Sequence, residues 1–198
     1  MPTPKASRPT PWLPRSEQQH LLRTVHAQGP VRDIALVQLV LHTGLRAGEL
    51  CALTWQDVVL SATRGTLHVQ GSPSLRRGGR ITRARTVPLN AAARTALRLL
   101  GYEVHHGTTR LICTGTRGPL TVRGAELIFA KYARLAGMPD LTLATLRHTF
   151  CRNLVEAGAD VASIAALAGH TTLESALPYF TPQQQDLEQL VEGLADEA

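Results

Sequence analysis

The sequence has few aromatic residues, few cysteines and no apolar run long enough to cross a bilayer. Aromatic side chains make up 4% of its 198 residues, so a core must be built mainly from Leu, Ala and Val, which the 43% hydrophobic content can supply. The three cysteines, Cys51, Cys113 and Cys151, are odd in number and far apart. This pattern fits neither a disulfide framework nor a zinc site, and it favours thiols buried as small hydrophobic groups.

Lysine is also scarce. The chain has Lys5 and Lys131 against 19 arginines, and its formal net charge is +6 with a pI near 9.9. A basic chain favours a polyanionic partner such as DNA or RNA, although many mildly basic proteins bind no nucleic acid. Residues 1–14 contain no apolar secretory segment. We therefore expect a cytoplasmic, nucleoid-associated protein with no membrane partner.

Hydrophobic periodicity, capping residues and helix breakers predict a mainly α fold with a small antiparallel β-sheet. Residues 1–15 are rich in proline and are expected to be a disordered leader or the end of a linker, followed by one domain over 16–198. The expected helices span residues 16–28, 31–42, 46–53, 90–100, 121–136, 145–157, 161–168, 171–177 and 183–194, and the expected strands span 66–70, 85–89 and 111–114.

One arginine stands at a turn that rigid elements should hold. The helix expected over 31–42 is apolar nearly all round, which indicates a buried helix. Gly44 is placed to end it in a left-handed conformation, and Arg46 begins the next short helix. Arg46 can therefore point into a cleft with a restricted rotamer. The alternative is a surface arginine that pairs with Glu49.

Five arginines lie in or beside the loop between the strands expected over 66–70 and 85–89. A basic hairpin of this kind can lie along a phosphate backbone, and each neutralised phosphate adds salt-dependent affinity. The alternative is a solvated, flexible hairpin. The arginines are Arg76, Arg77, Arg80, Arg83 and Arg85.

Four residues have side chains that suit one chemistry: Arg46, Arg147, His170 and Tyr179. Attack of a tyrosine oxygen on a DNA phosphodiester needs guanidinium groups to offset the charge of the pentavalent transition state, and Arg46 and Arg147 are the candidates. Tyr179 is the candidate nucleophile, and His170 can bind the phosphate or carry a proton. No acidic cluster that would hold a metal is present, so we expect no metal or cofactor.

These motifs resemble the catalytic domain of the tyrosine recombinases, the phage integrase family. The resemblance covers residues 16–194 in the order and spacing of the family. The segment that resembles the first arginine box is Thr43-Gly44-Leu45-Arg46-Ala47-Gly48-Glu49-Leu50, and the one that resembles the second is Leu146-Arg147-His148-Thr149-Phe150. The third box and the nucleophile are resembled by Ala168-Gly169-His170 with Tyr179, and the strand after the basic hairpin by Val87-Pro88-Leu89.

The resemblance implies a fold and an activity. The fold is that of the DNA breaking-rejoining domain, and the activity is metal-independent recombination of double-stranded DNA through a 3′-phosphotyrosine intermediate, with four protomers on two sites. His148, beside the second arginine, becomes a candidate DNA contact. A C-terminal helix often docks into the neighbouring protomer in this family, and the apolar stripe of the helix from Gln183 to Leu194 suits that role or packing within its own chain.

The sequence departs from the family pattern at several positions. The family usually has a hairpin lysine that protonates the leaving 5′ oxygen. Here Ser72 or Arg80 stands at that place, depending on the strand from which one counts, and Arg80 is the candidate. Arginine is a poor proton donor but can stabilise charge. Ala144 replaces a frequent histidine, and Pro178 should place Tyr179 at a helix end or on a loop.

The family usually also has an N-terminal DNA-clamping domain, for which fewer than twenty residues precede the first expected helix. Either a bare catalytic domain or a fragment is consistent with this. Two rival functions remain open. One is a degenerate recombinase that binds DNA without cutting it. The other is a helix-turn-helix regulator built on residues 160–178. The target site and the biological task, whether integration, excision, inversion or dimer resolution, do not follow from the sequence.

Overall fold

The computed structural model describes residues 12–71, 83–109, 112–115 and 118–180. The predictions for the leader, for Ser72, Arg76, Arg77 and Arg80, and for the helix from Gln183 to Leu194 lie outside these residues.

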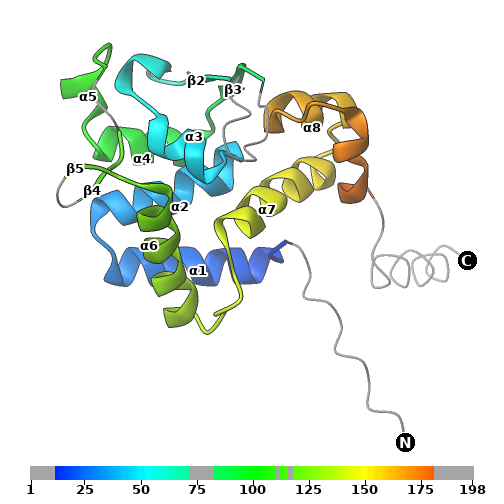
Figure 1. The fold of residues 1–198 in the computed structure, drawn as a ribbon, viewed down its shortest axis with the longest axis horizontal. Coiled ribbons are helices and arrows are strands. Elements are labelled where there is room, and N and C mark those ends of the chain that lie inside the picture. The colour runs from blue at the N-terminus through cyan, green and yellow to red at the C-terminus, as the bar shows by residue number, and fades with distance from the viewer. Residues whose placement is uncertain (1–11, 72–82, 110–111, 116–117, 181–198) are drawn as a thin grey trace, which may run out of the picture.

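A buried helix lies at the centre of the molecule. This helix, α2 (Val31–Thr43), packs against α1 (Arg15–Gln28), α4 (Ala91–Leu99), α6 (Val122–Leu135) and α7 (Leu143–Glu156) (Figure 1). Its apolar side chains from Ala35 to Leu41 are almost entirely buried, as its sequence predicts, while Val31 at its first turn is exposed. The mainly α architecture is thus confirmed among the described residues, and α2 is the rigid element from which the first arginine box projects.

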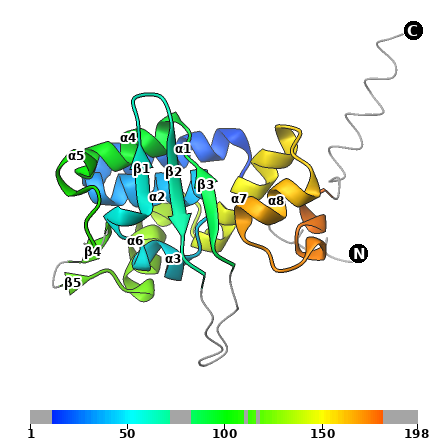
Figure 2. The ribbon, with the colours of Figure 1, turned by 90° about the horizontal axis from the view of Figure 1, so that it is seen from above.

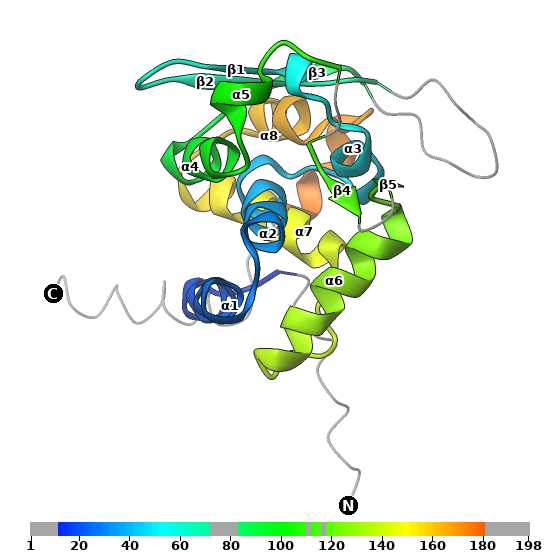
Figure 3. The ribbon, with the colours of Figure 1, turned by 90° about the vertical axis from the view of Figure 1, so that its left-hand side faces the viewer.

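A three-stranded antiparallel sheet covers one side of these helices. Its strands are β1 (Val58–Leu60), β2 (Gly65–Val69) and β3 (Arg85–Pro88), in that order, and α8 (Val161–Ala168) lies beside β3 (Figure 2). Alternate side chains of β2 and β3 point into the core, as the two-residue period of a strand requires. The sheet lies on the opposite side of the molecule from α1 (Figure 3). The sequence predicted β2 and β3 to within one residue at each end but missed β1.

Three local expectations need correction. The first helix begins at Arg15 after Pro14, not at Ser16, because the Gln18 side chain donates to the Leu13 carbonyl at 2.8 Å and the Leu13 N–H donates to the hydroxyl of Thr149 at 2.9 Å. These tertiary contacts set the start of the helix. The strand expected over 111–114 is instead a two-stranded ribbon, β4 (Thr114–Gly115) with β5 (Gly118–Pro119). The segment after α4, for which no helix or strand was predicted, contains α5 (Tyr102–His105).

The two helices that carry or precede the later motif residues, α7 and α8, each begin with a side-chain cap. Thr142 caps α7, so this helix begins at Leu143 instead of Thr145. Asp160 caps α8 (Val161–Ala168) by accepting a hydrogen bond from the Ser163 N–H at 2.6 Å. The remaining short elements are α3 (Ala47–Ala52), η1 (Trp55–Asp57), η3 (Leu173–Ser175) and η4 (Leu177–Tyr179).

The region after α8 decides against one rival function. A single helix was expected over 171–177, but the structure has two 3₁₀ turns, η3 and η4, with Pro178 in the second. A helix-turn-helix reader needs a second α-helix after the turn. Residues 170–180 do not provide one. Across the described ranges, we also find no helix whose length and apolarity would let it span a bilayer.

Candidate active site

Gly44 sets the direction in which Arg46 leaves α2. Its φ of 63° is left-handed, and a Cβ here would collide with the ring of Phe150. Arg46 then takes the N-cap position of α3, where its backbone N–H donates to a carboxylate oxygen of Glu49 at 2.9 Å. The expected pairing of Arg46 with Glu49 is therefore made by the backbone. The Arg46 side chain lies half-buried, and its Nε has no hydrogen-bond partner in the part of the chain that the structure describes.

Arg147 ties three motifs together from the middle of α7. One guanidinium nitrogen donates to the Gly44 carbonyl at 2.5 Å and the other to the Ala168 carbonyl at 2.6 Å. The residue is 7% exposed. Burial, followed by the nearby charge of Arg46, lowers the pKa of Arg147 to about 10, so it remains a cation at neutral pH. Two carbonyl acceptors offset part of the cost of burying this charge.

Arg85 is held by a bidentate ion pair and is not free to contact DNA. Its two terminal nitrogens donate to the two oxygens of Glu49, each at 2.9 Å, and its Nε donates to the Leu167 carbonyl at 2.9 Å. Only 5% of the Arg85 side chain is exposed. These three bonds join β3 to α3 and α8, so the buried guanidinium of Arg85 is not placed to lie along a phosphate backbone as the sequence led us to expect.

The same pair keeps Glu49 ionised. Burial alone would raise the pKa of Glu49, but hydrogen bonds from Arg85 and from the Arg46 backbone, with the charge of Arg147, hold it below its ordinary value. Gly169 packs directly on Arg85. A Cβ at this glycine would lie 2.7 Å from an Arg85 nitrogen, and its φ is 67°. The ion pair therefore supports the turn that presents His170.

His170 projects from that turn toward the other candidates. Its backbone N–H donates to the Ala165 carbonyl at 2.9 Å, and its ring stacks on the ring of Tyr179 with centroids 6.0 Å apart and an interplanar angle of 15°. Burial, followed by the charges of Arg147 and Arg46, lowers the pKa of His170 to about 4. The imidazole is therefore neutral at physiological pH. Its Nδ1 is buried, and none of the described residues forms a hydrogen bond with it.

Tyr179 ends the 3₁₀ turn η4, as the preceding proline led us to expect. The residue is 6% exposed. Its hydroxyl lies 2.7 Å from Nδ1 of His148 and also contacts the side chain of Cys151. Arg152 donates to the Tyr179 carbonyl at 3.2 Å. Burial and the contact with Cys151 raise the pKa of the Tyr179 phenol, so it is protonated in the free protein.

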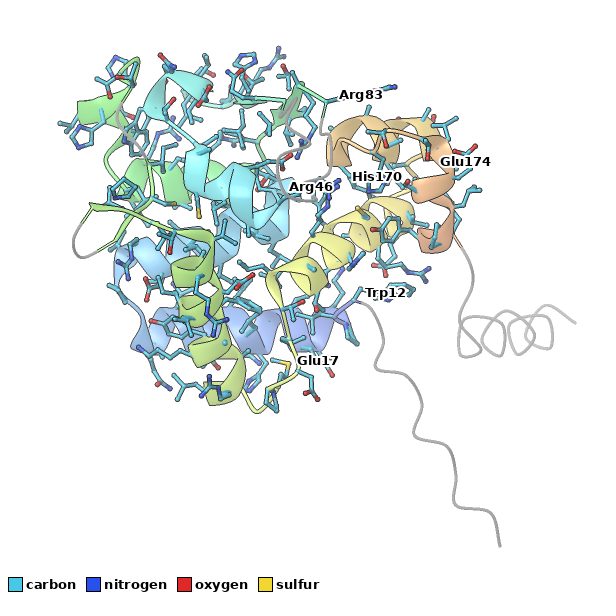
Figure 4. All side chains as sticks on the ribbon, viewed as in Figure 1. Trp12, Glu17, Arg46, Arg83, His170 and Glu174 are labelled. Atoms are coloured by element: carbon cyan, nitrogen blue, oxygen red, sulfur yellow. The ribbon has the colours of Figure 1, made fainter. Side chains whose placement is uncertain are left out.

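The structure therefore brings Arg46, Arg147, His170 and Tyr179 into one cluster. The positive charges of Arg46 and Arg147 act to lower the pKa of both His170 and Tyr179. Figure 4 shows Arg46 and His170 facing the same space between α3 and α8. Sequence reasoning missed the contact between His148 and Tyr179. The only available signal was that His148, Cys151 and Arg152 share one face of α7 at helical spacing.

Two hollows adjoin the cluster. The larger, about 740 Å³, is lined by four arginines and by two acidic residues, namely Arg46, Arg123, Arg134, Arg147, Glu126 and Asp140. The smaller, about 360 Å³, is lined by His170 and by Arg83, which is exposed at the start of the chain leading into β3. Within the described ranges, no group of three or more His, Cys, Asp or Glu side chains could hold a metal ion. The arrangement suits an anion bound by guanidinium and imidazole N–H groups.

Comparison with known proteins agrees with these motifs. The model of the phage integrase family matches residues 11–186. The tyrosine recombinase XerC of Roseiflexus castenholzii is 31% identical over 189 residues, which cover 89% of this chain and 57% of that protein. XerC of Bacillus subtilis is 29% identical over 188 residues, covering 89% of this chain and 59% of that protein. The chain thus spans somewhat more than half the length of these relatives.

Solved structures show the same fold. The crystal structure of XerA recombinase superposes with a TM-score of 0.77 at 22% identity, over 97% of this chain and 66% of that one. The pre-cleavage complex of XerH site-specific recombinase with difH substrate superposes with a TM-score of 0.73 at 20% identity, over 94% of this chain and 55% of that one.

Proposed function

Because the chain belongs to the phage integrase family and carries a tyrosine recombinase catalytic domain, we propose that it cuts and rejoins double-stranded DNA through a 3′-phosphotyrosine intermediate. We assign this catalytic domain to residues 16–198. Arg46, Arg147, His170 and Tyr179 are its active-site residues.

One observation carries the proposal. Arg46 Nε and His170 Nδ1 are buried nitrogens without hydrogen-bond partners among the described residues, and both belong to the cluster around Tyr179. A buried donor left unsatisfied costs about 1–3 kcal/mol, so each of these nitrogens needs a partner that the described residues do not supply. Both nitrogens lie in the field of Arg147, which favours an anionic ligand as that partner. A DNA phosphate next to a tyrosine fits these requirements.

The residues divide the chemistry between them. Arg46 and Arg147 bind the non-bridging oxygens of the scissile phosphate and offset the charge that develops as the tyrosine oxygen attacks. Neutral His170 donates an N–H to the same phosphate. The bond from phosphorus to the 5′ oxygen breaks, and a 5′ hydroxyl later attacks the phosphotyrosine and releases the phenol. The ester retains the bond energy, so the proposed reaction consumes no nucleotide.

Binding of DNA rests on a wider surface than the active site. Arg83, exposed beside the smaller hollow, is placed to contact a phosphate, and we assign the same role to Arg76 and Arg77 of the hairpin. Recombination of two sites requires a homo-oligomer on DNA, for which the helix from Gln183 to Leu194 is the proposed contact.

Covalent capture tests the proposal. Tyr179→Phe protein first selects binding sequences from a random duplex library, and the selected duplex is then nicked near the cleavage position so that rejoining cannot occur. We expect the wild-type chain to form a denaturant-resistant protein–DNA adduct and Tyr179→Phe to form none while binding the duplex equally well. Selective binding with no adduct from the wild-type chain would instead establish the alternative, a family member that binds DNA without cutting it.

A further inference from the structure

We infer that His148 is the catalytic group that accepts the phenolic proton of Tyr179 during DNA cleavage. This inference deepens the proposed function and rests on it. It replaces the expectation that His148 contacts DNA.

The ring of His148 contacts the hydroxyl of Tyr179 directly. Nδ1 of His148 lies 2.7 Å from the Tyr179 hydroxyl, and the two ring centroids are 5.6 Å apart at an interplanar angle of 41°. This geometry is within the range in which a positioned base removes a proton. Because Tyr179 is only 6% exposed, bulk water has little access to the phenol, and the acceptor should be a protein group.

The other groups that face the phenol are poorer proton acceptors than His148. Cys151 also contacts the hydroxyl, but burial raises the pKa of its thiol. A protonated thiol is a weak acceptor. His170 lies nearly parallel to the phenol ring, and no hydrogen bond from its ring nitrogens to the hydroxyl is found within the described residues. Ala144, one turn earlier on the same face of α7, brings no titratable group. His148 is the group whose ring nitrogen lies at hydrogen-bond distance from the oxygen.

The protonation state of His148 also suits a base. Tyr179, His170 and the cation Arg147 face or neighbour His148. Burial, followed by the charge of Arg147, lowers the pKa of His148, so it is a neutral imidazole at pH 7. In the tautomer with hydrogen on Nε2, Nδ1 can accept the proton. Since the phenol pKa is raised, transfer before attack is uphill, and the proton moves as the new ester bond forms.

Cleavage and rejoining move one proton between Tyr179 and His148. The bond from the tyrosine oxygen to phosphorus forms, the phenolic proton passes to Nδ1 of His148, and the bond from phosphorus to the 5′ oxygen breaks. The departing 5′ oxygen takes a proton from water. In rejoining, a 5′ hydroxyl attacks phosphorus and releases its proton to water, while the imidazolium of His148 returns its proton to the tyrosine oxygen.

The pH dependence of single-turnover cleavage, measured with the nicked duplex selected above, tests this role. For the wild-type chain, we expect the rate to rise with pH below about 6.5 and then level off, because His148 is deprotonated above its lowered pKa. His148→Gln should cleave about 10²–10⁴-fold more slowly. Its rate should continue to rise above pH 7, by about tenfold per pH unit, because hydroxide then removes the proton.

Two further variants make the result specific. His170→Gln is the matched control and should lose rate while keeping the wild-type plateau, because its base is intact. His148→Ala opens space beside the phenol, and added imidazole should restore part of its cleavage rate. Equal thermal unfolding and duplex binding exclude a folding defect.

The outcomes separate this inference from the function on which it rests. A wild-type chain that forms no adduct refutes the proposed function and this inference with it. Adduct formation by the wild-type chain together with a wild-type pH profile in His148→Gln refutes the inference alone. A variant that is slow but retains the plateau, and is not rescued by imidazole, also overturns it and leaves His148 a structural role.

Discussion

Arg147 donates a hydrogen bond at 2.5 Å to the backbone carbonyl of Gly44, a residue 103 positions earlier in the chain. The second arginine box therefore holds the turn that carries the first. Its other hydrogen bond, to Ala168, reaches the end of the helix that precedes His170. A residue proposed to bind the phosphate also positions the other two groups that bind it, and this dual role separates Arg147 from Arg46.

Arg46→Ala and Arg147→Ala should differ in stability but not in their effect on cleavage. Each should reduce adduct formation by about 10²-fold or more, as loss of a charge-stabilising donor does. Arg147→Ala should also lower the free energy of unfolding by about 1–3 kcal/mol, because it leaves buried carbonyls without donors. Arg46→Ala removes a buried nitrogen that has no hydrogen-bond partner among the described residues, and it should not lower the free energy of unfolding. Urea unfolding and covalent capture measure the two effects, and equal destabilisation would contradict this assignment.

Gly44→Ala should destabilise the protein by about 2 kcal/mol or more, because it combines a left-handed residue with a steric clash against Phe150. Gly48→Ala is the matched control. Gly48 lies within α3, nothing is near its Cβ position, and alanine there should stabilise by about 0.5–1 kcal/mol. Thermal or urea unfolding distinguishes the two. Similar stability of both variants would mean that the turn at Gly44 is not constrained as described.

Glu49→Gln should destabilise the fold by about 3 kcal/mol or more, since it leaves the buried Arg85 cation without its charge partner. The pH dependence has a defined sign. The folded pKa of Glu49 lies below its unfolded value, so its contribution is present above pH 4.5 and is lost as pH falls through the folded pKa. Urea unfolding of Glu49→Gln should lack this loss. A variant as stable as the wild-type chain would show that the pair is dispensable.

His170 should make the protein less stable as the pH is lowered from 6.5 to 4. Its pKa is about 4 in the folded chain against an ordinary value of 6.5. Between these values the unfolded chain binds more protons, so the free energy of unfolding falls as pH decreases and is level outside the window. In His170→Gln this slope should be reduced, with the lowered pKa of His148 supplying a part that remains. An unchanged slope in urea titrations at several pH values would contradict the assignment.

Arg80→Lys tests the absence of the hairpin lysine. If Arg80 stands where an acid should protonate the departing 5′ oxygen, lysine should raise the single-turnover cleavage rate, because its ammonium titrates near 10 while arginine titrates above about 12. Arg77→Lys is a control for the general effect of lysine in the hairpin. No change, or a loss of rate, in Arg80→Lys would assign the proton to another donor.

The sequence by itself determined the elements that depend on neighbours in the chain. Gly44 ends its helix in a left-handed conformation and Pro178 leaves Tyr179 at the end of a short turn, both as predicted from the local pattern. Gly169, Asp160 and Asn90 likewise end or cap their helices through contacts with adjacent residues. The motif spacing also named the cluster of two arginines, a histidine and a tyrosine that the fold assembles.

Only the tertiary structure decided which side chains are already occupied. Arg83 and Arg85 are alike in sequence and charge, yet Arg83 is exposed while Arg85 is buried against Glu49, 36 residues away. The motifs led us to expect that His148 contacts DNA and that His170 binds the phosphate or carries a proton, yet it is the ring nitrogen of His148 that lies 2.7 Å from the Tyr179 hydroxyl. The physical reason is that caps and turns depend on a few adjacent residues. The partner of a buried charge or ring depends instead on how distant helices and strands pack, which the local sequence pattern does not contain.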